Sequence, residues 1–199
     1  MHGMQQMFLP TLILVFAWML NSTIKELGTA NYLVALLGER LPAAWLPALV
    51  FLLASTISFS TGTSWGTMAI VMPLAIPLAV RLTGFEVGSP ASPVLVATVG
   101  AVLAGAVFGD HCSPISDTTI VSAFSSDCDV MAHVRTQLPY ALTAALLAMI
   151  VGYLPAGYGI SPGWLLAAGG LACWILVRYC GKPIPKSAVG KSTPAAADA

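Results

Sequence analysis

The chain has 199 residues, of which 8% are charged and 57% are hydrophobic, and its formal net charge at pH 7 is zero. Soluble domains carry about 25% charged residues, so the composition excludes a soluble fold and predicts a polytopic, all-helical membrane protein. The zero net charge argues against nucleic acid as a partner, because proteins that bind it present a clustered basic surface. Four cysteines without a C-x-x-C pair are expected to be free thiols.

The first predicted element is a membrane span over residues 4–24. Its apolar centre, residues 8–20, reaches the ~20 residues needed to cross a bilayer only when both flanks are included. No small-residue cleavage pattern follows, so we expect this span to be retained rather than removed as a signal peptide. Residues 32–41 carry leucines at helical spacing and end in charges, which predicts an amphipathic helix at the membrane interface.

A polar interruption follows at residues 60–67, between apolar runs at residues 43–59 and 68–80. Its two glycines and five hydroxyl residues are unfavourable in a helix interior. The segment is therefore either two spans or one span with a re-entrant arm. A plain extramembrane turn, or small residues that allow close helix packing, would explain the same pattern.

A second interruption follows a predicted solvent loop at residues 81–92. The apolar run at residues 94–108 leads into residues 109–119, which contain two carboxylates, one imidazole and four hydroxyls. Pro114 removes a backbone donor and restricts the residue before it, so a helix should break near Ser113. A shorter apolar run, residues 120–124, follows the break. Paired interrupted helices of this kind indicate the binding site of a secondary transporter with discontinuous or re-entrant helices.

The last predicted spans are residues 138–154 and 164–179, joined by a Pro/Gly turn at residues 155–163. We expect residues 1–181 to form one transmembrane domain and residues 182–199 to be a disordered tail. Basic residues lie at the start of the tail, and Arg135 lies beside His133 in the segment two crossings earlier. The positive-inside rule therefore predicts a cytoplasmic C-terminus in a multi-pass protein of the cell inner (plasma) membrane.

The chemistry of the second interruption favours a cation that competes with a proton. Hard cations such as Na+ take oxygen ligands, and a carboxylate in low dielectric holds its proton at higher pH, so one side chain can bind either. His111 is an alternative proton carrier. Asp117 has a structural alternative, because a carboxylate there can simply cap a helix that begins nearby. The candidate cation- and proton-binding residues are Thr63, Ser64, Asp110, His111, Ser113, Ser116, Asp117, Thr118 and Thr119, with Na+ at Asp110 and Asp117 and no other cofactor.

The sequence also allows two other kinds of site, a hydrolase triad and a metal site. Residues 62–66 fit G-x-S-x-G, the motif of the nucleophile elbow in hydrolases. Ser64 with His111 and Asp110 or Asp117 could then form the triad of an intramembrane hydrolase, although a nucleophile elbow requires a strand before the serine. Asp127, Asp129 and His133 could hold a metal ion, but a helix start capped by Ser126 or Asp127 explains them more simply. These readings are kept as alternatives to transport.

Three motifs resemble one family. Residues 58–67 read SFSTGTSWGT, residues 108–119 read FGDHCSPISDTT and residues 133–140 read HVRTQLPY. They resemble the signature of the NhaC-type Na+/H+ antiporters over about residues 4–179. The resemblance implies secondary active exchange of Na+ for H+, with some relatives exchanging organic acids for Na+, and no enzymatic activity. It also implies that the chain corresponds to the C-terminal repeat of a longer, inverted-repeat transporter. Its expected partners are Na+, H+ and the lipid bilayer, together with the missing N-terminal half or a second copy of the chain. The alternative function is that of a non-transporting membrane subunit or remnant.

Overall fold

The structure, a computed structural model, describes residues 42–86 and 88–180 together with positions 15, 19, 22, 23, 26, 27 and 32. Within these residues the secondary structure is helical and contains no strand, which confirms the all-helical prediction. Four stretches are long and apolar enough to cross a membrane: Ala43–Thr61, Ser64–Thr83, Pro93–Cys112 and Val130–Gly157. The predicted span at residues 4–24, the interfacial helix at residues 32–41 and the tail at residues 182–199 lie outside the continuously described residues.

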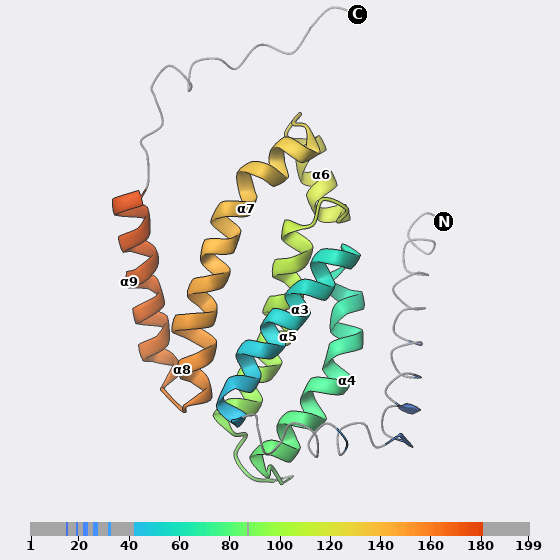
Figure 1. The fold of residues 1–199 in the computed structure, drawn as a ribbon, viewed down its shortest axis with the longest axis vertical. Helices are drawn as coiled ribbons and strands as arrows, with labels where there is room; N and C mark the ends of the chain where they lie inside the picture. The colour runs from blue at the N-terminus through green and yellow to red at the C-terminus, as the bar shows by residue number, and fades with distance from the viewer. Residues whose placement is uncertain are drawn as a thin grey trace, which may run out of the picture.

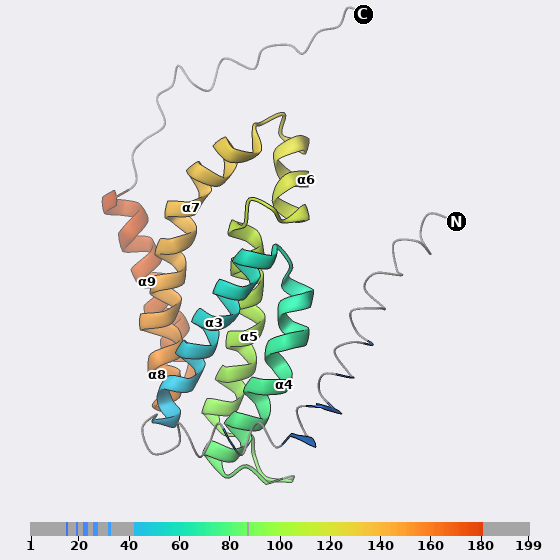
Figure 2. The same ribbon diagram turned by 45° about the vertical axis from the view of Figure 1, so that its right-hand side comes forward.

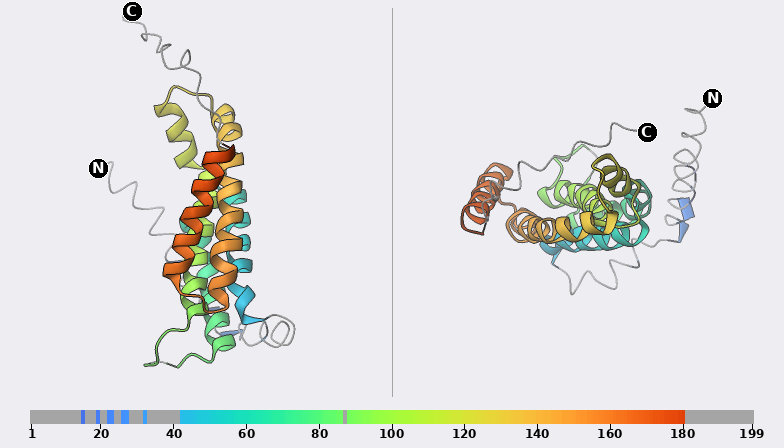
Figure 3. Two further views of the ribbon diagram at one scale, coloured as in Figure 1. Left: turned by 90° about the vertical axis from the view of Figure 1, so that its left-hand side faces the viewer. Right: turned by 90° about the horizontal axis from the view of Figure 1, so that it is seen from above.

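The long helices alternate in direction along the chain (Figures 1 and 2). A 3-10 turn, Ala43–Trp45, leads into α3 (Leu46–Thr61), which is followed by α4 (Ser64–Thr83) and α5 (Pro93–Cys112). The short α6 (Asp117–Ser125) comes next, and α7 (Val130–Leu147) continues through a π-helical segment, η2 (Ala148–Tyr153), into α8 (Leu154–Gly157). The last helix, α9 (Pro162–Cys180), lies beside α7 at the outer edge of the molecule (Figure 3).

The closest helix pair is α3 with α5, and glycine makes that approach possible. A Cβ built on Gly105 would lie 2.6 Å from the carbonyl oxygen of Phe51, and one built on Gly109 would lie closer still to that of Ser55. Small residues four apart let helix backbones approach in this way in membrane proteins. The hydroxyl of Ser58 donates to the carbonyl of Ala106 at 2.5 Å, which ties the two backbones together.

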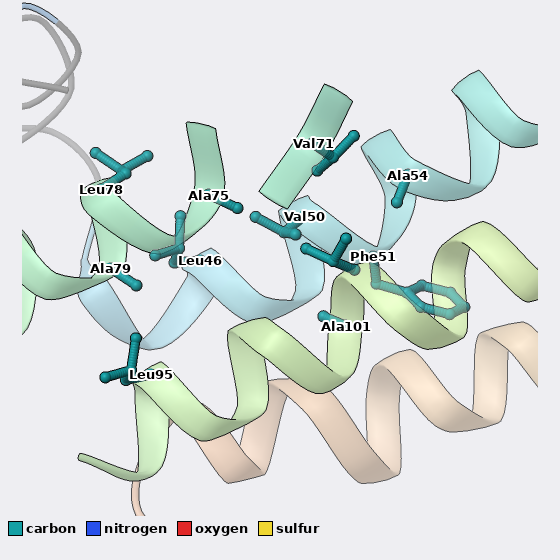
Figure 4. Packing of buried hydrophobic residues seen from close by; sticks show 11 residues of the cluster. Leu46, Val50, Phe51, Ala54, Val71, Ala75, Leu78, Ala79, Leu95 and Ala101 are labelled. Carbon is teal, nitrogen blue, oxygen red and sulfur yellow. The ribbon is translucent and has the colours of Figure 1, made fainter. Parts of the chain in front are cut away.

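Apolar side chains of α4 complete this core. Buried residues of α3, α4 and α5 form one cluster, shown in Figure 4, which includes Phe51, Val71, Ala75, Ala101 and Val102. The predicted solvent loop at residues 81–92 is shorter than expected, because α4 continues to Thr83 before it ends at a left-handed Gly84, with φ of 62°. These three helices form the scaffold on which both polar interruptions sit.

The helix that contains α7 is longer than the predicted span at residues 138–154. It begins at Val130 and reaches Gly157, past Pro155, where a turn was expected. Proline lacks the N–H that an α-helix needs four residues after each carbonyl. The chain accommodates Pro155 by widening first into the π segment, in which the N–H of Leu154 donates to the carbonyl of Met149.

Candidate cation site

The interruption at residues 60–67 is a tight turn between two helices. α3 ends at Thr61, and Gly62 adopts the left-handed conformation with φ of 66°. Thr63 is the N-cap of α4, and its hydroxyl accepts a hydrogen bond from the N–H of Gly66 at 3.3 Å. Both arms of this hairpin have the length and apolarity of membrane spans.

The interruption at residues 109–119 is a broken helix, as the sequence predicts. α5 ends at Cys112, and Ser113 is extended with φ of −73° and ψ of 130° before Pro114. Ser113 is fully buried, and its hydroxyl accepts a hydrogen bond from the N–H of Ile115 at 3.4 Å. The short α6 begins at Asp117, so four residues separate two helices of different length.

The two interruptions lie against each other. A Cβ built on Gly62 would lie 2.9 Å from Cγ1 of Ile115 and 3.0 Å from its carbonyl oxygen. One turn before the break, Gly109 packs on the backbone of Phe59 near the end of α3. The turn between α3 and α4 therefore contacts the connection between α5 and α6. Both connections lie at the same end of the α3–α5 scaffold (Figure 2).

Asp110 is the buried carboxylate at this end. Its side chain is 7% exposed, and its Oδ1 accepts a hydrogen bond from the hydroxyl of Ser116 at 2.7 Å. Ser116 is itself fully buried and shares a second hydrogen bond of 2.7 Å with the hydroxyl of Thr118. The carboxylate of Asp110 thus accepts a hydrogen bond from the Ser116 hydroxyl, and Thr118 extends this contact into a short chain of hydroxyls across the break.

Asp117 has a different environment. Its side chain is exposed, and its Oδ1 accepts a hydrogen bond from the N–H of Thr118 at 2.7 Å. A carboxylate in the first turn of a helix is favoured by the free N–H groups and the helix dipole. Asp117 therefore makes the kind of contact expected of a residue that stabilises the start of a helix. Asp110 lies at the end of α5 and has no helix start to stabilise.

The other predicted side chains differ in how far they enter the site. Thr119 is buried and its hydroxyl donates to the carbonyl of His111 at 3.2 Å. The imidazole of His111 is exposed, so its backbone rather than its ring takes part in the observed contacts. Ser64 is half-buried at the start of α4, and a helix rather than a strand precedes it, which removes the basis for a nucleophile elbow.

Two residues of this region were not predicted as site residues. Nε2 of Gln137 in α7 donates to the carbonyl of His111 at 2.5 Å. Ser58 is fully buried at the end of α3 and reaches α5 through Ala106. Gln137 belongs to the motif at residues 133–140 and Ser58 begins the motif at residues 58–67. Their presence in those motifs is the signal that could have identified them.

The alternative metal site at residues 127–133 is explained by local structure. Oδ1 of Asp129 accepts a hydrogen bond from the N–H of Ala132 at 2.9 Å, so Asp129 caps α7. The prediction of a cap at Ser126 or Asp127 was wrong by a few residues, because Asp127 is left-handed with φ of 48° and the helix starts after it. In residues 42–86 and 88–180, no three His, Cys, Asp or Glu side chains gather to hold a metal ion, and Cys112, Cys128 and Cys173 are free thiols.

Comparison with known proteins gives the family. The model of the Na+/H+ antiporter family matches residues 1–158. An uncharacterized protein of Haemophilus influenzae is 42% identical over 159 residues, covering 80% of this chain and 29% of that protein. The malate-2H(+)/Na(+)-lactate antiporter of Bacillus subtilis is 38% identical over 120 residues, covering 56% of this chain and 24% of that protein. An uncharacterized Na(+)/H(+) antiporter of Haemophilus influenzae is 32% identical over 145 residues, covering 71% of this chain and 29% of that protein.

No solved structure matches the chain. The chain spans less than a third of the length of these curated relatives. The family is one of membrane transporters rather than enzymes, which agrees with the apolar helices and with the broken helix at Asp110. The chain belongs to the Na+/H+ antiporter family.

Proposed function

We propose that this chain forms the cation-binding core of a secondary active antiporter that exchanges Na+ for H+, with Asp110 as the group that binds either ion. The observation that supports the proposal most directly is the buried Asp110 carboxylate at the end of a broken membrane-length helix. A carboxylate buried in a membrane protein without a charged partner is costly, and such groups by default mark a functional site. Hydroxyl contacts alone do not neutralise that carboxylate.

Exchange follows from competition for one carboxylate. When Asp110 is ionised, Na+ can bind it together with nearby hydroxyl and backbone oxygens, which are the ligands that hard cations prefer. When Na+ leaves, a proton takes its place in the proposed cycle, so the carboxylate holds one ion or the other. We propose Ser113, Ser116 and Thr118 as neighbouring oxygen donors, with Thr119 supporting them from α6.

In this proposal the α3–α4 turn and Asp117 act on the approach of the cation to Asp110 and do not bind it directly. Thr63 and Ser64 begin α4 beside the broken helix, and we propose that their hydroxyls line the approach to Asp110. Asp117, exposed at the start of α6, is proposed to attract the cation toward the site. His111 is kept as a candidate proton carrier through its exposed ring.

A second candidate function is Na+-coupled exchange of an organic acid. It is favoured by the 38% identity to a protein named a malate-2H(+)/Na(+)-lactate antiporter. The two functions share the Na+ site and differ in whether a carboxylic acid moves with the ions. Accumulation of labelled lactate or malate that depends on a Na+ gradient would favour this candidate over simple exchange.

The working unit is proposed to contain helices beyond those described. None of the most apolar part of Val130–Gly157 is buried inside the chain, compared with 44% for Ala43–Thr61. Together with the length of the relatives, this supports a second copy or a separate N-terminal half as partner, in addition to lipid. We place the complex in the cell inner membrane with a cytoplasmic C-terminus, because Lys182, Lys186 and Lys191 follow α9.

Proton movement in everted membrane vesicles tests the function. Vesicles from an antiporter-deficient host that expresses the chain should lose their internal acidity when Na+ is added, as read by a pH-sensitive dye. Asp110→Asn should abolish this response while the protein stays in the membrane. Asp127→Asn is the control, because Asp127 is exposed and asparagine tolerates its left-handed backbone. Normal exchange by Asp110→Asn, with an unchanged pH profile, would show that this carboxylate is not the exchanging group.

Asp117→Asn separates the two aspartates. If Asp117 mainly supports the start of α6, its substitution should lower the amount of folded protein but leave the apparent affinity for Na+ close to that of the parent. A raised apparent KM for Na+ at normal expression would support the proposed attraction of the cation by Asp117. Loss of exchange at normal expression would instead favour Asp117 as a member of the cation shell with Asp110.

A further inference from the structure

The backbone oxygen of His111 joins three helices. It belongs to the last turn of α5, where an α-helix leaves carbonyl groups without intrahelical partners. The hydroxyl of Thr119 in α6 donates to it at 3.2 Å, and Nε2 of Gln137 in α7 donates to it at 2.5 Å. Because the preceding residue is Asp110, these two donors fix the backbone directly beside the buried carboxylate.

Few side chains connect α7 to this end of α5. Val134 is the buried residue of α7, and Gln137 follows it by three positions, so both lie on one face of the helix. At the other end of the same long helix, Tyr153 stacks on Phe51 with ring centroids 5.0 Å apart, and its hydroxyl donates to the carbonyl of Gly100 at 3.4 Å. Two side-chain donors, far apart on α7 and η2, thus bind two backbone oxygens of α5.

We propose that Gln137 is a positioning residue of the cation site, which makes the geometry at Asp110 depend on the position of α7. This inference rests on the proposed function. The amide is neutral, so Gln137 adds no charge that would compete with Na+ for the carboxylate. Its role is to hold the His111 carbonyl, and with it the last turn of α5. A shift of α7 that withdraws the amide lets the end of α5 move and changes the affinity for the cation.

The inference requires an effect on Na+ affinity rather than on maximal rate. Gln137→Met keeps a side chain of similar length but removes the donor. Its apparent KM for Na+ should rise about threefold to tenfold, which corresponds to losing one interhelical hydrogen bond in a membrane, with the maximal rate within about twofold. Thr136→Val is the matched control, because the hydroxyl of Thr136 donates only to carbonyls of its own helix, those of Ala132 and His133. An unchanged KM in Gln137→Met overturns the positioning role.

A second measurement does not depend on transport. Cys112 directly follows His111 and is 1% exposed, so its reaction with a membrane-permeant maleimide reports opening of the end of α5. In a background with Cys128, Cys173 and Cys180 replaced by serine, Gln137→Met should be labelled several times faster than the parent, and Thr136→Val at the parent rate. Equal rates in all three overturn the inference.

The two measurements distinguish this inference from the proposed function. If the parent shows no Na+-dependent proton movement, the proposed function fails and labelling of Cys112 alone decides whether Gln137 holds the break. If the parent exchanges Na+ for H+ and labelling is unchanged by Gln137→Met, the proposed function stands and the role of Gln137 is refuted.

Discussion

Gly109→Ala tests whether the close contact of α3 and α5 holds the site together. The added Cβ would lie 2.6 Å from the backbone nitrogen of Phe59 and closer still to the carbonyl oxygen of Ser55, whereas real Cβ atoms essentially never approach another atom to less than 3.0 Å, so the two backbones must move apart. Neither partner is the end of a flexible side chain that could turn away. Overpacking of this kind typically costs about 1–3 kcal/mol. The same movement would weaken the hydrogen bond from Ser58 to Ala106, one turn before Asp110.

Gly100→Ala is the matched control for this experiment. It lies on the same helix, and a Cβ there would have nothing within 4 Å. Both substitutions gain the helix propensity of alanine, about 1 kcal/mol, so their difference isolates the packing cost. Thermal unfolding in detergent, followed by the loss of the monodisperse chromatographic peak, should show Gly109→Ala melting several degrees below Gly100→Ala. If Gly109→Ala melts at the same temperature as Gly100→Ala or higher, α3 and α5 are not packed as described.

Two further predictions use the same melting assay. Gly62→Ala should destabilise more than Gly84→Ala, because both glycines are left-handed, with φ of 66° and 62°, but only a Cβ at Gly62 would meet Ile115; equal losses would mean that the two interruptions do not touch. Asp129→Ala should cost about 1 kcal/mol through loss of the α7 cap, whereas Ser126→Ala should cost little; the reverse order would restore the cap expected from the sequence.

Local sequence features were enough to predict where the helices break. Pro114 ends α5 within a residue of the expected position, and the glycine and hydroxyl residues around Gly62 produce the expected turn, because these effects act through the nearest backbone groups. The effect of Pro155 was not predictable in the same way. A proline normally signals a helix end, and only the structure shows the preceding turn widening so that the helix continues.

The contacts across the site needed the tertiary structure. The sequence indicates that Asp117 could cap a helix, but it does not show that Asp110 is buried against Ser116 while Asp117 is exposed at a helix start. Gln137 lies 26 positions after His111, and no periodicity in either helix indicates that they meet. Such pairs depend on how helices are arranged in space, which a hydrophobic pattern does not specify.

The π segment sets the rotational phase of the long helix. Gln137 and Tyr153 are 16 residues apart, so at about 100° per residue a regular α-helix would place them about 160° apart, on opposite faces. One π turn takes up one additional residue and reduces that angle to about 60°, so both side chains can face α5. Deleting Gly152 should therefore be absorbed by conversion of the segment to regular helix, with both contacts kept.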